Sequence, residues 1–127
     1  MTKPTTQSIF NQVAEHLLTQ NAQSFAVANS RNCAYRGAGG RKCAVGCLIT
    51  DEHYHPSIEG CSSTSSGVAS RVLASIDPSD TLQEEQYEIQ SLLRRLQTMH
   101  DHYAPTEWPK RLGRIATEFN LKPFTKE

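Results

Sequence analysis

The chain has 127 residues, of which 37% are hydrophobic, and its 13 basic side chains balance its 13 acidic ones. This length fits one domain. The neutral balance argues against a protein that coats nucleic acid, because such proteins normally carry an overall basic bias. No stretch approaches the roughly 20 apolar residues that span a bilayer. The first residues also lack the apolar core of a signal peptide, so we expect a cytoplasmic protein whose cysteines are reduced.

The first predicted element is an amphipathic helix from about residue 6 to residue 20. Ile9, Val13 and Leu17 recur there at helical spacing, which predicts one buried face. Thr5 or Thr6 supplies a side-chain oxygen that can cap the first turn.

The second predicted element is a two-stranded antiparallel hairpin within residues 31–48. Runs of strand character flank residues 36–40, where three of four consecutive positions are glycine. Glycine tolerates positive φ, so this pattern predicts a loop of about five residues. The predicted register places Cys33 opposite Cys43 and Tyr35 opposite Arg41. A lone ribbon is not stable, so we expect it to pack on helices.

The remaining elements are predicted to be helical or irregular. Together with the hairpin they indicate an α+β fold, a mostly helical single domain with about four helices and a small sheet. The first of these elements is a helical turn from Asp51, capped by Thr50 and ended by Pro56, and a flexible serine-rich loop at 62–67 follows. Next come a short helix at 68–76 and a long helix that begins at a Thr81–Glu84 capping box. The last helix runs from Thr106 to a stop at Asn120.

The glycine-rich turn is the first candidate binding site. Arg36, Arg41 and Lys42 place cations around it, with Arg31 nearby, and its glycines can expose amide hydrogens. That combination is typical of a nest for phosphate or carboxylate. The alternative, a tight turn with solubilising charges, stays open. The candidate ligand-binding residues are Tyr35, Arg36, Gly37, Gly39, Gly40, Arg41, Lys42, Asp51, Tyr54, His100 and Asp101.

The cysteines form the second pattern. Cys43 and Cys47 have a spacing used by zinc sites, and His53, His55 and Cys61 follow nearby. A site of Cys43, Cys47, His53 and Cys61 is therefore conceivable. In an extended chain, however, the Cα atoms of the first two lie about 13 Å apart, too far to share one ion. We expect no cofactor and small, buried, reduced thiols, with zinc as the alternative.

The third pattern is the pair His100 and Asp101. A histidine beside an acid can act as a general base, with Cys33 or Cys43 as its nucleophile. Nothing in the sequence brings these groups together, and a helix C-terminus favours histidine in any case. We therefore assign no catalytic residue and favour a protein that is not an enzyme.

A set of short motifs runs through most of the chain. They are Cys33-x-Tyr35-Arg36-Gly37, Gly40-x-Lys42-Cys43-Ala44-x-Gly46-Cys47-Leu48-Ile49, Asp51-Glu52-x-Tyr54, Glu59-Gly60, Leu96-Gln97-x-x-His100-Asp101, and Trp108 with Leu112, Ile115-Ala116, Phe119 and Leu121. In these motifs the chain resembles a widespread group of small proteins of tailed phages and prophages. The resemblance implies a bacterial cytoplasm during infection or lysogeny, where small proteins of this size commonly bind host machinery, including defence systems.

Two functional hypotheses follow, with structural zinc as a third. The leading one is a non-enzymatic binding protein that modulates a host protein or a host defence or signalling process. The alternative is a binder of a phosphorylated small molecule or nucleotide through the glycine-rich turn. Convergence of Arg36, Arg41, Lys42, Asp51, Tyr54 and His100 on one pocket would favour the small ligand, whereas scattered positions on a flat face would favour a protein partner.

Overall fold

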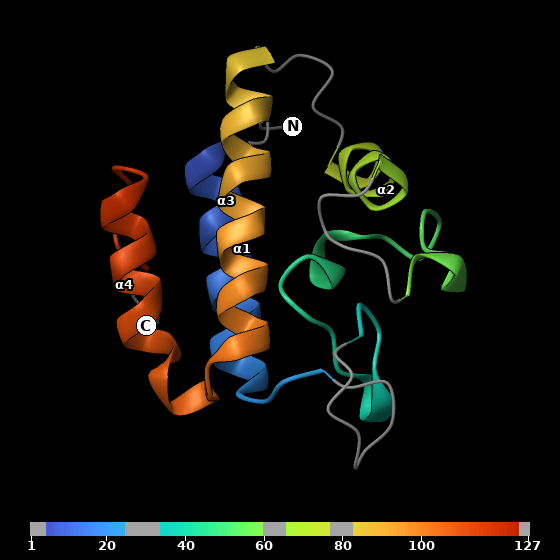
Figure 1. The fold of residues 1–127 in the computed structure, drawn as a ribbon, viewed down its shortest axis with the longest axis horizontal. Coiled ribbons are helices and arrows are strands. Elements are labelled where there is room, and N and C mark those ends of the chain that lie inside the picture. The colour runs from blue at the N-terminus through green and yellow to red at the C-terminus, as the bar shows by residue number, and fades with distance from the viewer. Residues whose placement is uncertain (1–4, 25–33, 60–65, 77–82, 125–127) are drawn as a thin grey trace.

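The computed structural model describes residues 5–24, 34–59, 66–76 and 83–124 (Figure 1). Its helices are α1 (Thr6–Gln20), α2 (Ser66–Ile76), α3 (Gln83–His102) and α4 (Trp108–Glu118). Short 3₁₀ turns lie between them: η1 (Ala38–Gly40), η2 (Gly46–Leu48), η3 (Pro56–Ile58) and η4 (Pro105–Glu107). None of the described helices combines the length and the apolarity that crossing a membrane requires.

Helix α1 has the bounds that its periodicity predicts, and a capping box explains its start. The Thr5 side chain accepts a hydrogen bond from the amide of Ser8, and the Ser8 hydroxyl accepts one from the amide of Thr5. Two of the amides left unpaired by the first turn are thereby satisfied. The helix ends at Asn21, whose φ of 50° is a left-handed C-cap.

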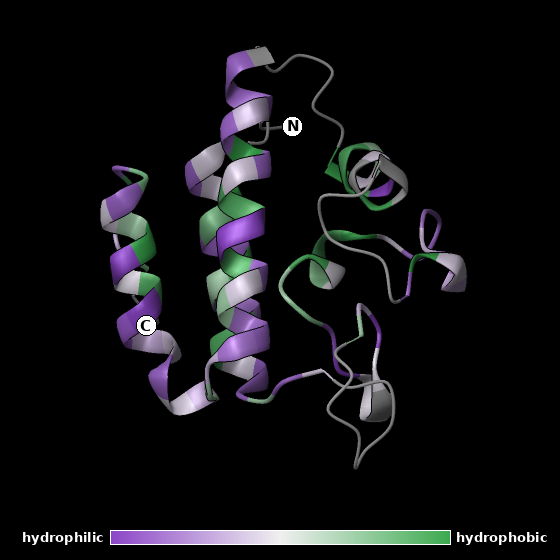
Figure 2. Cartoon of the chain, in the orientation of Figure 1, coloured by the Kyte–Doolittle hydropathy of each residue, from purple (hydrophilic) through white to green (hydrophobic). Residues whose placement is uncertain are grey.

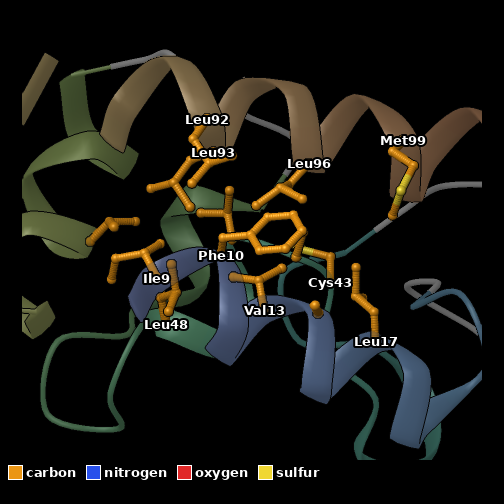
Figure 3. Close-up of a cluster of buried hydrophobic side chains, with 14 of the residues drawn as sticks. Ile9, Phe10, Val13, Leu17, Cys43, Leu48, Leu92, Leu93, Leu96 and Met99 are labelled. Carbon is orange, nitrogen blue, oxygen red and sulfur yellow. The ribbon is translucent and has the colours of Figure 1, made fainter. Parts of the chain in front are cut away.

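The core lies mainly between α1 and α3, which contact each other along their apolar faces, with α4 packed against both. Each helix presents a stripe at three- and four-residue spacing, which is the geometry that buries one side of a helix. Figure 3 shows the two stripes facing each other, with side chains of the intervening chain between them. The labelled buried residues are Ile9, Phe10, Val13 and Leu17 of α1, Leu92, Leu93, Leu96 and Met99 of α3, and Cys43 and Leu48.

Residues 34–59 and α2 cover the other side of the α1–α3 pair from α4 (Figure 1). Hydrophobic residues run along the segment around η2 and along α2 (Figure 2). Ala44, Val45 and Ile49 are buried there, as are Val68 and Val72 of α2. This segment has little regular structure, so its apolar residues, rather than a sheet, attach it to the helices.

The predicted α+β class is wrong, and the fold is all-α. The described residues contain no strand, and the expected hairpin is reduced to one antiparallel bridge between Arg36 and Lys42, which also contradicts the predicted Tyr35–Arg41 register. The physical reason lies in the main chain. The amides of Tyr35 and Arg36 bind the Glu59 carboxylate, and the Lys42 amide binds the Gln20 side chain. Groups engaged by side chains cannot build a ladder.

Other boundaries differ in smaller ways. Helix α2 begins at Ser66, inside the predicted serine-rich loop, and residues 62–65 lie outside the described residues. Thr81 of the predicted capping box also lies outside them. Helix α4 begins at Trp108 after the η4 turn, rather than at Thr106. The predicted stop at Asn120 is confirmed by its left-handed φ of 59°.

Two glycines give a matched stability test. A Cβ at Gly46 would overlap the carbonyl oxygen of Tyr35, whereas one at Gly113 in α4 would meet nothing within 4 Å. We expect Gly46→Ala to destabilise the fold by about 3 kcal/mol or more, because the obstructing atom belongs to the main chain. Gly113→Ala should stabilise it by about 0.5–1 kcal/mol. Urea denaturation measures both, and an unchanged midpoint for Gly46→Ala would contradict this packing.

Candidate functional site

The structure distributes the predicted site residues among three groups rather than one pocket. The Arg36 cluster contains Arg36, Asp51, Tyr54 and Glu59, with the main chain of Tyr35. The turn groove lies between the η1 turn and α1, and it is lined by Gln12, Glu15, His16, Thr19, Gln20, Gly39, Gly40 and Arg41. The His100 cluster contains Ser24, Gln97, His100, Asp101 and Trp108.

In the Arg36 cluster, the guanidinium is already neutralised by the protein. Its Nη2 lies 2.6 Å from a carboxylate oxygen of Asp51 and 3.2 Å from the carbonyl oxygen of Ile49. Its Cζ lies 4.2 Å from the centre of the Tyr54 ring, at cation–π distance. The predicted residues Arg36, Asp51 and Tyr54 therefore do meet, but they bind one another.

Glu59 holds the cluster together, and the prediction missed it. One carboxylate oxygen accepts the Tyr35 amide at 2.9 Å, and the other accepts the Arg36 amide at 3.1 Å and the Tyr54 hydroxyl at 2.6 Å. Burial and the Glu59 carboxylate raise the pKa of Tyr54 to about 12, so the phenol stays protonated and donates. The sequence did hold one signal. Glu59 belongs to the same set of resemblance motifs as Tyr35, Arg36 and Tyr54, the residues that it binds.

The two acids of this cluster should differ in their contribution to stability. Glu59→Gln replaces one of the two accepting carboxylate oxygens with an NH₂ group, which can only donate. A main-chain or phenol donor is then left unpaired. We expect a loss of about 2–3 kcal/mol. Asp51→Asn should cost less than about 1 kcal/mol, because the Asp51 side chain is 90% exposed. Urea denaturation measures both, and equal losses would show that Glu59 is not the central acceptor.

The His100 cluster is structural. The His100 ring is fully buried and stacks on Trp108, with the ring centres 5.7 Å apart. Its Nε2 lies 3.0 Å from the amide nitrogen of Ser24, which can only donate, so Nε2 accepts. Its Nδ1 then carries the proton that is shared with Asp101 at 2.8 Å. Gln97 donates to the same carboxylate oxygen and accepts the amide of Val45.

This arrangement does not offer a general base. A catalytic histidine needs a free nitrogen within reach of a substrate proton, but Nε2 of His100 is occupied by the Ser24 amide and has no exposed surface. The Ser24 hydroxyl continues the chain of contacts by donating to the carbonyl oxygen of Arg41. His100 therefore positions the main chain beneath the turn rather than contacting the turn groove.

The turn groove is open to solvent and has a volume of about 540 Å³. Gly39 and Gly40 have φ of 72° and 75°, so the positive values that glycine was predicted to supply are present at these two positions. The amide of Gly37 donates to the carbonyl oxygen of Arg41 at 2.8 Å, so it is not free to bind an anion. Arg41 is exposed, and neither its side chain nor that of Lys42 forms an ion pair with a described residue.

Helix α1 fixes the main chain at Lys42 from the other side of the groove. The carbonyl oxygen of Lys42 accepts from Nε2 of His16 at 2.9 Å and from the side-chain amide of Gln20 at 2.8 Å. The main-chain amide of Lys42 donates to the side-chain oxygen of Gln20. Burial lowers the pKa of His16 from 6.5, and the charge of Lys42 acts in the same direction. His16 and Gln20 belong to the polar edge of the predicted helix and carried no recognisable binding pattern in the sequence.

The lowered pKa of His16 predicts a pH-dependent stability. Below pH 6.5 the His16 imidazole binds a proton more readily in the unfolded chain than in the folded one. The free energy of unfolding therefore falls as the pH drops below 6.5, and this decline ends below the pKa of His16 in the folded chain. Urea midpoints at several pH values between 7.5 and 5 should show this decline, and His16→Gln should flatten it. His102→Gln removes an exposed histidine and should leave the slope unchanged; an unchanged slope in His16→Gln would contradict the assignment.

The extended segment expected between Cys43 and Cys47 is wrong, because the Cys47 amide donates to the Cys43 carbonyl and the chain turns there. The turn removes the distance objection to a shared zinc ion, but both thiols are otherwise engaged. The Cys43 sulfur accepts from the Gly46 amide, and the Cys47 thiol donates to the Ala44 carbonyl. Burial raises the pKa of both thiols, that of Cys47 to about 12, so neither is a ready thiolate.

Cys33 and Cys61 lie outside the described residues. Within those residues, no three or more His, Cys, Asp or Glu side chains gather closely enough to hold a metal ion. Cys61 was one of the four predicted ligands, so the structure does not test the full set.

Comparisons with protein families, with curated proteins and with solved structures found no match to this chain. The resemblance to small phage proteins therefore stays a prediction, and the site is interpreted from its own geometry.

Proposed function

We propose that this chain is a non-enzymatic binding protein of the phage or prophage type. It contacts an acidic surface of a host protein through Arg41, which lines the turn groove, and the neighbouring Lys42. The observation that carries the proposal is the scatter of the chemistry-bearing residues. Arg36 is paired with Asp51, although its buried Nε has no hydrogen-bond partner among the described residues, and Nε2 of His100 accepts the Ser24 amide. Arg41 and Lys42 remain without a charged partner in the described part of the chain.

The shape and charge of the groove favour a macromolecular partner over an enclosed small ligand. Small-ligand sites are usually concave and bury most of their ligand. This groove is open, and Glu15 lines it together with Arg41, which disfavours a fully charged phosphate. The small-ligand alternative also loses Arg36, which lies against Asp51. A protein surface can combine an acidic contact to Arg41 and Lys42 with polar contacts to α1.

The main chain under the groove is held rigidly enough to present these cations. Gln20 and His16 bind the peptide groups of Lys42, and the Ser24 hydroxyl binds the carbonyl of Arg41. His100 fixes Ser24 from inside the core. Because the loop is already ordered, binding would lose less conformational entropy than binding by a mobile loop.

The buried thiols and the occupied histidine support the non-enzymatic part of the proposal. Nucleophilic catalysis needs an activated group that a substrate can reach. Cys43 is 1% exposed, and burial raises its pKa well above the usual range for a thiol.

The test is a quantitative pull-down from bacterial lysate with the full chain as bait. The wild type should recover a host protein, and recovery should fall as salt is raised. Arg41→Glu combined with Lys42→Glu should weaken it by about tenfold or more, since each charged contact contributes about 1.5–3 kcal/mol where water is excluded.

Arg94→Glu combined with Lys110→Glu is the matched control, because both residues are exposed and neither lines the groove. Equal loss in the two double variants, or recovery of no protein by the wild type, would reject the proposal. Unfolding midpoints with a nucleotide panel at millimolar concentration test the small-ligand alternative. A rise that depends on Arg41 would favour that alternative.

A further inference from the structure

A second basic site lies between α3 and α4, apart from the turn groove. The two helices border a cleft of about 190 Å³, which is half enclosed. Arg95 of α3 and Arg111 and Arg114 of α4 line it. Figure 1 shows α4 on the side of the α1–α3 pair that faces away from residues 34–59, so this cleft and the turn groove belong to different faces.

Helical spacing brings these arginines together. Arg111 and Arg114 are three residues apart on α4 and therefore share one face of that helix. Arg95 lies across from them on α3, and the Thr98 hydroxyl follows three residues later on the same face. Three guanidinium groups on the walls of one small cleft repel one another unless negative charge compensates them.

The acids of the chain compensate this charge only in part. Arg95 lies 2.8 Å from Glu118, and Arg111 lies 3.5 Å from Glu107; both carboxylates are about half exposed, and neither lines the cleft. Arg114 is exposed and forms no ion pair within the described ranges. The cleft therefore keeps an excess of positive charge.

Arg111 is held in place and retains one unused donor. Its guanidinium lies over the Tyr103 ring, with Cζ 3.9 Å from the ring centre. Its Nε is buried and has no hydrogen-bond partner in the described structure. Buried donors are normally paired. Because this Nε has no exposed surface, an anion in the cleft would meet the terminal nitrogens of Arg111 rather than Nε.

We propose that the α3–α4 cleft binds a small phosphate monoester. Its phosphoryl oxygens would accept from the three arginines and the Thr98 hydroxyl, since guanidinium groups suit phosphate geometry. Its organic group would contact the apolar part of the wall, Met99 and Ile115. The cleft volume of about 190 Å³ lies below the roughly 300–1,000 Å³ of sites for drug-sized ligands, which suits a phosphate with a small substituent.

The probe is phenyl phosphate, titrated into the full chain and followed by amide NMR shifts and by calorimetry. Inorganic phosphate, phenol and sodium chloride at matched ionic strength serve as comparisons. We expect phenyl phosphate to bind most tightly and to shift the amides of Thr98, Tyr103 and Arg114. Arg114→Gln should weaken its affinity by about tenfold, the loss expected for one charged hydrogen bond.

Arg114 is the residue to replace because it is exposed, so the variant should keep its fold. Arg94→Gln removes the same charge from an exposed α3 position outside the cleft and should leave the affinity unchanged. Equal weakening by both variants, equal affinity for inorganic phosphate or phenol, or shifts confined to the turn groove would each overturn the proposal. Shifts confined to the turn groove would instead favour the small-ligand alternative there. The other outcomes do not bear on the proposed protein partner, which is tested through Arg41 and Lys42.

Discussion

The structure depends on side chains that bind the main chain of residues 34–59. This segment is covered by helices yet forms no ladder, so its buried peptide groups need other partners. Gln20 of α1 supplies them at Lys42, Gln97 of α3 supplies one at Val45, and Glu59 supplies them at Tyr35 and Arg36. These contacts set the shape of the turn, and through it the direction in which each of its cations points.

The same constraint separates what the sequence could predict from what it could not. The bounds of α1 and the stop at Asn120 follow from local periodicity and from capping residues, which need no knowledge of the rest of the chain. The hairpin prediction used equally local signals, glycines between β-prone residues. It failed because Glu59 and Gln20 bind amides of the expected strands, and these partners lie 22 to 24 residues away in sequence, so only the folded chain brings them close. Tertiary partners overrode local propensity.

The candidate site divides in the same way. The sequence correctly drew attention to a basic turn with positive-φ glycines, because charge and glycine spacing are local properties. It could not show that Arg36 pairs with Asp51, or that Nε2 of His100 accepts a hydrogen bond from the Ser24 amide. The α3–α4 cleft was equally hidden, since Arg95 and Arg114 meet only through the packing of two helices whose apolar faces fix their rotation.

A chain with no net charge can still carry local excesses of positive charge. The acids near the cations of the groove and the cleft, Glu15, Glu107 and Glu118, are fewer than those cations, and other acids lie elsewhere. Glu84 and Glu88, for example, are exposed on the N-terminal half of α3, away from the arginines that line the cleft. At physiological salt, charges further apart than about 8 Å are largely screened from each other. The distant acids therefore have little effect on the short-range contacts of an anionic partner. The recognition proposed at either surface must then come from short-range geometry, which is why the hydrogen bonds that hold the turn and the ring that holds Arg111 matter more than total charge.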